Sequence, residues 1–161
     1  PWLATVGVER EQIRLEGSQP KGKHFVVRFL LNPYSAARNV EDALAAVNVG
    51  ADAIVVSNHG GRQLDGAVSS IAALPPIVDA VNDRAEVWMD SGIRSGQDVL
   101  RAIALGAQGT MIGRAFLYGL GAKGQAGVRQ ALDIIHKELD LTLGLCGHSD
   151  LSKVDSSILI K

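Results

Sequence analysis

Short apolar runs alternate with longer amphipathic segments from about Phe25 to the C-terminal end of the chain. Four runs have the length and residue types of strands, and the segments between them carry apolar residues at helical spacing. The predicted strands are 25–27, 53–56, 86–89 and 110–112, and the predicted helices between them are 40–49, 70–81 and 95–105. Strands that are apolar throughout and alternate with helices are typical of a parallel sheet covered by helices.

Two junctions between a helix and the next strand look like copies of each other. Residues 46–54 and 102–110 each end a helix, place a glycine at the turn (Gly50 or Gly106) and begin a strand. A glycine in that place predicts a left-handed helix cap. The repetition favours a repeating α/β architecture, either a barrel or a solenoid. Apolar residues at helical spacing over 124–145 predict a closing helix after about four βα units.

Composition narrows the class of protein. Sixteen basic and 17 acidic residues give a net charge of −1, and the basic residues are dispersed, which argues against nucleic-acid binding. Cys146 is the single cysteine, so we expect no intrachain disulfide, and the scattered His24, His136 and His148 predict no metal site. No apolar run is long enough to span a bilayer and no signal peptide is visible. We therefore expect a cytoplasmic protein.

The first candidate for chemistry is the loop 57–66, which follows the predicted strand 53–56. Its His59 can exchange a proton near neutral pH, and its Arg62 can hold a planar carboxylate through two parallel hydrogen bonds. Gly60 and Gly61 let the backbone approach a ligand. A glycine-rich turn with a surface histidine and arginine is the plainer interpretation. Because loops at such strand ends often carry function, the combination favours a site.

Two further candidates follow the next two strands. In residues 90–96 a strand ends at Asp90, and a helix begins near Ser95. This start is either an anion site beside Arg94 or an ordinary helix cap, with Ser95 capping and Arg94 in solvent. The third candidate is Gly113-Arg114, at the end of the fourth predicted strand. Loops after the last two strands of a (β/α)₈ barrel commonly form a phosphate site, so the pair is more specific than either member.

These three motifs resemble the FMN-dependent 2-hydroxy-acid dehydrogenase/oxidase family, which includes L-lactate dehydrogenase, glycolate oxidase and mandelate dehydrogenase. The resemblance begins at about Val40 and is greatest to the bacterial L-lactate dehydrogenase branch, on 113–118 and 124–128. The family fold is a (β/α)₈ TIM barrel, so the resemblance implies that residues 25–148 form the C-terminal half of an FMN-binding barrel. Residues 1–24 match poorly and are expected to be a linker or surface segment. Residues 32–39 look like an insertion, and 149–161 like a polar tail.

The resemblance implies a role for each matched residue. His59 would accept a proton from the hydroxyl or α-carbon of an L-2-hydroxy acid, most readily L-lactate, and Arg62 would hold the substrate carboxylate. FMN would be the cofactor, because oxidation to the 2-oxo acid needs a two-electron sink that side chains lack. The residues expected to bind FMN are Ser57, Asp90, Gly92, Arg94, Gly113 and Arg114, together with Arg28, which stands where the family has a lysine.

The family's barrel is longer than this chain, because a full barrel needs about 200 or more residues. In the family, the N-terminal half carries a substrate-binding tyrosine and much of the flavin pocket. The open sheet edges of a half-barrel favour pairing, so the expected partners are a second copy or an N-terminal half, besides the 2-hydroxy acid. Peripheral contact with the inner membrane or with an electron acceptor is a further alternative, because relatives in this family can deliver electrons to the respiratory chain.

Two other functions stay open at this point. One is a non-catalytic or truncated flavin- or phosphate-binding half-barrel that is inactive alone, favoured by the absent half and by Arg28 in place of lysine. The other is a different phosphate-binding barrel enzyme, such as an isomerase. That alternative would make the pairing of His59 with Arg62 coincidental.

Overall fold

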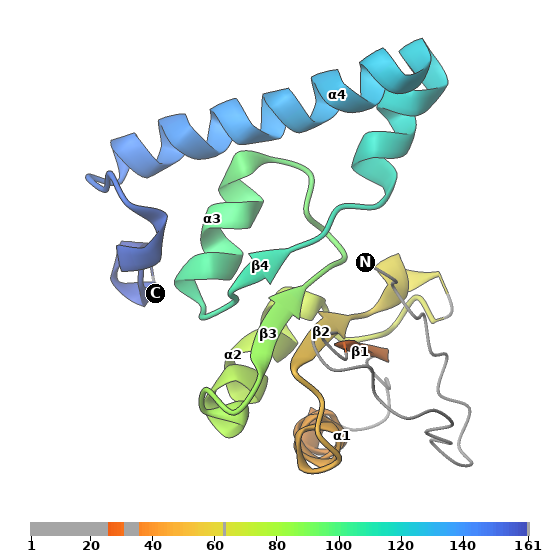
Figure 1. The fold of residues 1–161 in the computed structure, drawn as a ribbon, viewed down its shortest axis with the longest axis vertical. Coiled ribbons are helices and arrows are strands. Elements are labelled where there is room, and N and C mark those ends of the chain that lie inside the picture. Colours follow the sequence, from red (N-terminus) through yellow and green to blue (C-terminus); the bar gives the residue numbers. More distant parts are fainter. Residues whose placement is uncertain (1–25, 31–35, 63, 161) are drawn as a thin grey trace.

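The described residues fold around one parallel sheet of four strands in the order β1-β2-β3-β4 (Figure 1). The computed structural model describes residues 26–30, 36–62 and 64–160, with side chains from Val40 onward. The strands are β1 Val26–Leu30, β2 Ala53–Ser57, β3 Glu86–Met89 and β4 Gly109–Thr110. The α-helices are α1 Ala36–Asn48, α2 Ser70–Val81, α3 Gly96–Ala104 and α4 Arg114–Leu145. Short 3₁₀ helices are η1 His59–Gly61, η2 Leu151–Lys153 and η3 Ser156–Ile158.

The strands and helices predicted from the apolar pattern correspond to these elements, with differences at their ends. Helix α1 begins at Ala36, four residues before the prediction, so the second half of the segment interpreted as an insertion is helical. Strand β4 begins one residue earlier than predicted and ends at Thr110, two residues before the predicted end. The reason for the early start is Gln108, which pairs with Val87 before the apolar run starts. Its backbone N–H donates to the Val87 carbonyl at 2.8 Å, and its side-chain oxygen accepts from the Val87 N–H at 2.7 Å.

The two predicted glycine caps are confirmed. Gly50 and Gly106 have φ of +94° and +96°, in the left-handed region that glycine tolerates best. A Cβ on Gly106 would lie 2.6 Å from Cγ1 of Val78 in α2. The turn after α3 is therefore both left-handed and pressed against the neighbouring helix, so it fixes where β4 starts.

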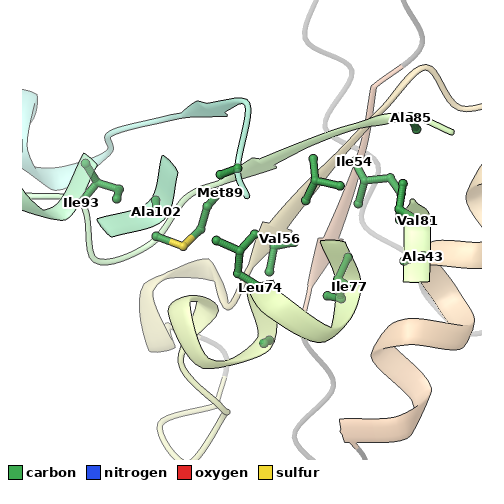
Figure 2. Close-up of a cluster of buried hydrophobic side chains, with 13 residues drawn as sticks. Ala43, Ile54, Val56, Leu74, Ile77, Val81, Ala85, Met89, Ile93 and Ala102 are labelled. Carbon is green, nitrogen blue, oxygen red and sulfur yellow. The ribbon is translucent and has the colours of Figure 1, made fainter. Parts of the chain in front are cut away.

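The core fills the space between one face of the sheet and the helices (Figure 2). Ile54 and Val56 of β2 and Met89 of β3 pack there against Leu74 and Ile77 of α2. All five residues of β2 are buried, as expected for an inner strand of a parallel sheet. Burial on this scale fixes the register of β2, and register determines which residues emerge at the end of each strand.

Helix α4 consists of two helical segments joined at a kink. Lys123 and Gly124 have non-helical dihedral angles, and Figure 1 shows the second segment running across α3. At the kink the two segments touch backbone to backbone, since a Cβ on either Gly119 or Gly127 would overlap the carbonyl oxygen of the other. A Cβ on Gly96 would likewise overlap the α4 backbone at Leu139. Glycines therefore set the path of the closing helix.

The C-terminal tail ends in two capped 3₁₀ turns. Asp150 accepts a hydrogen bond from the Ser152 hydroxyl, and Asp155 accepts one from the Ser157 backbone N–H at 2.8 Å. Hydrogen bonds from the Ser152 and Ser157 side chains, followed by those from their backbones, lower the pKa of both carboxyl groups. Within the described ranges, every helix is too short or too polar to span a bilayer.

The kink in α4 gives a test of the packing. Gly127→Ala should destabilise the full chain by about 1–3 kcal/mol, because the added methyl group has to push the two helix segments apart. Gly121→Ala is the matched control, since nothing lies within 4 Å of its added Cβ. It should stabilise the chain by up to about 1 kcal/mol, as alanine is the better helix former. Urea unfolding followed by circular dichroism measures both, and equal midpoints for the two variants would contradict this account.

Candidate active site

A cleft of about 790 Å³ opens where β2, β3 and β4 end. The carboxyl ends of parallel strands lie at one edge of a sheet, which is where ligands bind in α/β folds. The cleft collects seven of the residues predicted from the sequence: His59, Arg62, Asp90, Gly92, Arg94, Gly113 and Arg114. Ser57 is fully buried at the end of β2. Arg28 is part of β1, paired with Val55, but its side chain lies outside the described residues.

The loop after β2 turns through three consecutive residues with positive φ. His59, Gly60 and Gly61 have φ of +56°, +66° and +70°, and a histidine in this region is strained. The Asn58 side chain accepts from the Gly60 N–H at 2.9 Å, while the Ser70 hydroxyl accepts from the Asn58 N–H at 3.1 Å. The turn is thus fastened to the start of α2, and it carries His59 into the cleft.

The imidazole of His59 is half-buried. Its Nδ1 atom is buried and has no hydrogen-bond partner among the described residues. Buried polar atoms nearly always have a partner, so this atom marks a place where a further group belongs.

Serine hydroxyls tie this turn to the end of β3. The Ser57 hydroxyl accepts from the His59 N–H at 3.1 Å, and the Ser91 hydroxyl accepts from the Gly60 N–H at 3.0 Å. Ser91 donates its own proton to the buried carboxylate of Asp90 at 2.7 Å. The first two sequence motifs therefore form one hydrogen-bonded unit.

The start of α3 is capped by carboxylates. Asp98 accepts from the backbone N–H groups of Arg94 and Ser95, at 3.1 and 3.0 Å, in a capping box. Glu138 of α4 accepts from the Gly96 N–H at 3.0 Å. Of the two alternatives for this motif, the structure shows the helix cap. The exposed side chain of Arg94 nevertheless lines the cleft.

The start of α4 differs, because its N-cap residue Gly113 has no side chain to cap the helix. Arg114, the first helical residue, turns back and donates to the Gly60 carbonyl at 3.0 Å. A Cβ on Gly60 would lie 2.7 Å from that guanidinium and would displace it, and the φ of +66° at Gly60 also favours glycine. Among the described residues, three arginines and one carboxylate line the cleft, which gives it a positive potential suited to an anionic ligand.

Several residues of this network carried no role in the sequence prediction. Asn58, Ser70, Ser91 and Glu138 reach their partners across the strand ends or between helices. The capping residue Asn58 could have been identified from its position before a glycine pair. The other contacts join residues 12 to 42 positions apart, which local sequence does not reveal.

The arrangement can do acid–base chemistry on an anion. It offers the His59 imidazole, a guanidinium three residues away along the chain, and a cationic patch from two other loops. Among the described residues, no group of three or more histidine, cysteine or acidic side chains could hold a metal ion.

Comparison with known proteins shows the family to which this chain belongs. Residues 38–161 match the family of FMN-dependent dehydrogenases. The chain is 52% identical over 134 residues to an L-lactate dehydrogenase of Caulobacter vibrioides, covering 83% of this chain and 33% of that protein. It is 55% identical over 119 residues to an L-lactate oxidase of Nostoc sp., covering 74% of this chain and 33% of that protein. It therefore spans about a third of the length of the curated relatives it matches.

Comparison with solved structures gives the same family. A mandelate oxidase variant with the monooxide FMN adduct superposes with a TM-score of 0.72 at 48% identity, over 80% of this chain and 38% of that one. Mandelate oxidase with benzoyl-formic acid gives the same TM-score and identity, over 80% of this chain and 36% of that one. With the family match over residues 38–161, these likenesses show that the chain belongs to the FMN-dependent dehydrogenase family.

Proposed function

We propose that the protein containing this chain oxidises an L-2-hydroxy acid, with L-lactate as the first candidate, to the 2-oxo acid, with FMN as its cofactor. The observation that carries this proposal is the meeting of His59 and Arg62 with two further arginines in one cleft. Relatives named L-lactate dehydrogenase and L-lactate oxidase support the substrate class. A solved relative with an FMN adduct supports the cofactor.

The residues present fit FMN. Its phosphate is an anion, and Arg94, Gly113 and Arg114 supply two guanidinium groups and an uncapped helix start. Open space lies where a Cβ on Gly92 or Gly113 would point, so the backbone can approach a ligand closely. We assign Ser57, Asp90 and Gly92 to the rest of the cofactor. When bound, FMN supplies the two-electron acceptor that protein side chains lack.

His59 and Arg62 would act on the substrate itself. Arg62 is exposed in the cleft and would hold the substrate carboxylate through two parallel hydrogen bonds. His59 would accept the proton lost as the hydroxyl carbon becomes a carbonyl. The protonated imidazole needs an acceptor for Nδ1–H, and that atom has no partner among the described residues. We propose that a carboxylate from another part of the protein, or from a partner, supplies it.

A proposal about the whole fold follows from the partial length of the chain. We propose that the four strands are half of a (β/α)₈ barrel, closed by an N-terminal half or by a second copy. The chain spans about a third of its relatives' length. Leu117, Tyr118 and Leu120 at the start of α4 are 48%, 75% and 47% exposed, an apolar surface that further chain would cover. In the closed barrel Arg28 would face the flavin. The protein would work in the cytoplasm, and peripheral contact with the membrane would bring it to an electron acceptor.

The phosphate assignment is tested by comparing FMN with riboflavin. Arg114→Met and Arg94→Met should each weaken FMN binding roughly 10- to 100-fold, because each removes a charge-assisted hydrogen bond to the phosphate. Riboflavin lacks the phosphate, so its affinity should stay within about twofold. Fluorescence quenching of each flavin by the full chain gives both constants. Equal losses for FMN and riboflavin would place the phosphate elsewhere.

The redox assignment is tested by visible spectroscopy. The chain is measured alone and with residues 38–161 grafted in place of the matching segment of the Caulobacter vibrioides relative. Anaerobic L-lactate should bleach the flavin of the graft. His59→Gln should slow bleaching by about 10²- to 10⁴-fold, while His136→Gln, on the exposed surface of α4, should not. Bound flavin that never bleaches in the graft would favour a flavin-binding protein without catalysis.

The carboxylate clamp has its own test. Arg62→Met in the graft should weaken L-lactate binding roughly 10- to 100-fold, because the substrate carboxylate loses its charged partner. Arg129→Met, which removes an exposed arginine on α4, is the control. Stopped-flow bleaching against lactate concentration separates binding from rate. An unchanged dissociation constant in Arg62→Met would remove Arg62 from the proposed substrate site.

A further inference from the structure

Ser91 has an unusual backbone for its residue type. Its φ is +68°, and the next residue, Gly92, has φ of +98°. A serine seldom adopts this conformation, whereas glycine does so freely. The conformation brings the Ser91 hydroxyl to both Asp90, at 2.7 Å, and the backbone N–H of Gly60, at 3.0 Å. The strained residue is thus the one that bridges two loops.

The direction of these hydrogen bonds is fixed by chemistry. A hydroxyl has one proton, and that of Ser91 goes to the carboxylate of Asp90, which is buried at the end of β3. The Ser91 oxygen is then left as an acceptor for the Gly60 N–H, and for the Ser57 hydroxyl in a weaker contact at 3.4 Å. Ser57 in turn accepts from the His59 N–H at 3.1 Å. Through Ser91 and Ser57, the buried Asp90 carboxylate thereby orients the backbone N–H groups of His59 and Gly60.

The peptide groups on both sides of Gly60 are held from neighbouring βα units. Ser91, after β3, accepts from its N–H, and Arg114, at the start of α4, donates to its carbonyl at 3.0 Å. Gly60 directly follows His59, so its orientation sets the direction in which the imidazole enters the cleft.

We propose that Ser91 is a positioning residue for His59, acting through the Gly60 peptide. The inference rests on the proposed function, in which His59 accepts the substrate proton. Small displacements of a reacting group can cost a factor of about 100 in rate. A serine that merely shapes the loop would affect stability, whereas a positioning serine affects the chemical step.

Two variants separate the hydroxyl from the backbone strain. Ser91→Ala removes the hydroxyl and keeps the strained backbone of an L-residue, and Ser91→Gly removes both. The control is Asp83→Gly, at an exposed residue with φ of +60° in the turn before β3, remote from the cleft. It relieves strain of the same kind without touching the network. All are made in the graft described above, and amide exchange of the peptide 57–61 is also followed in the full chain.

The expected result is the same for both Ser91 variants. Amide exchange at Gly60 should be faster, and bleaching at saturating L-lactate should be roughly 10- to 100-fold slower. The dissociation constants of FMN and L-lactate should stay within about threefold, and Asp83→Gly should match the parent. An equal loss of rate in Ser91→Ala, which keeps an L-residue, and in Ser91→Gly, which relieves the strain, identifies the missing hydroxyl as the cause.

Two results would overturn the inference. One is unchanged exchange at Gly60 in both variants, and the other is faster exchange with a bleaching rate within twofold of the parent. A parent graft that binds FMN but never bleaches would defeat the proposed function instead. In that event amide exchange at Gly60 tests Ser91 on its own. Faster exchange in the variants supports the hold of Ser91 on the Gly60 peptide, and unchanged exchange refutes it.

Discussion

The left-handed turn at His59–Gly61 is the constraint on which the site depends. Of three successive residues with positive φ, His59 is the one for which the conformation is costly, because Gly60 and Gly61 adopt it freely. Such a conformation persists only where its surroundings hold it. Here β2 is buried at every residue, so its end cannot shift, and side chains from two other loops hold the Gly60 peptide. The His59 imidazole is therefore held by a backbone that would relax without these contacts.

Helices α3 and α4 both begin near the cleft, but their first backbone N–H groups differ in what they bind. Carboxylates of Asp98 and Glu138 take the first backbone N–H groups of α3, which anchors that helix to its own first turn and to α4. The start of α4 has no such side-chain cap. An anion would therefore meet free helix-start amides at α4, and would meet α3 only through Arg94. Among the described residues, Asp90 is the one acidic group that lines the cleft, and its carboxylate accepts a hydrogen bond from Ser91.

The sequence predicted the elements well because their periodicities are strong and their turns are marked by glycine. The positions of Gly50 and Gly106 predict left-handed helix caps, and both residues adopt that conformation. The misplaced ends have local causes. Ahead of Val40, residues 36–39 lack the apolar spacing that would reveal the first turn of α1, and Gln108 joins the sheet by using its side chain as well as its backbone. Neither effect is visible in a hydrophobic pattern.

The clustering of the candidate site was predictable for a topological reason: the loops that follow successive parallel strands meet at one edge. The contacts that give the cluster its geometry were not. Ser91 reaches Gly60 across 31 positions, and Glu138 reaches Gly96 across 42. The first hydrogen bond exists because β2 and β3 end side by side, and the second because α4 packs against α3. A motif identifies which groups are available, while the register of the sheet decides which of them touch.

The same reasoning explains why the site is chemically unfinished in this chain. Hydrogen bonds from its own loops fix the turn, and its own arginines supply the positive charge. The buried Nδ1 of His59, in contrast, has no hydrogen-bond partner among the described residues. An imidazole accepting a proton at one nitrogen needs an acceptor at the other, since a buried cation without a partner is costly. The chain thus holds the His59 imidazole in place, and the described residues provide no acceptor for its Nδ1 atom. In the proposed function, that acceptor comes from another part of the protein or from a partner.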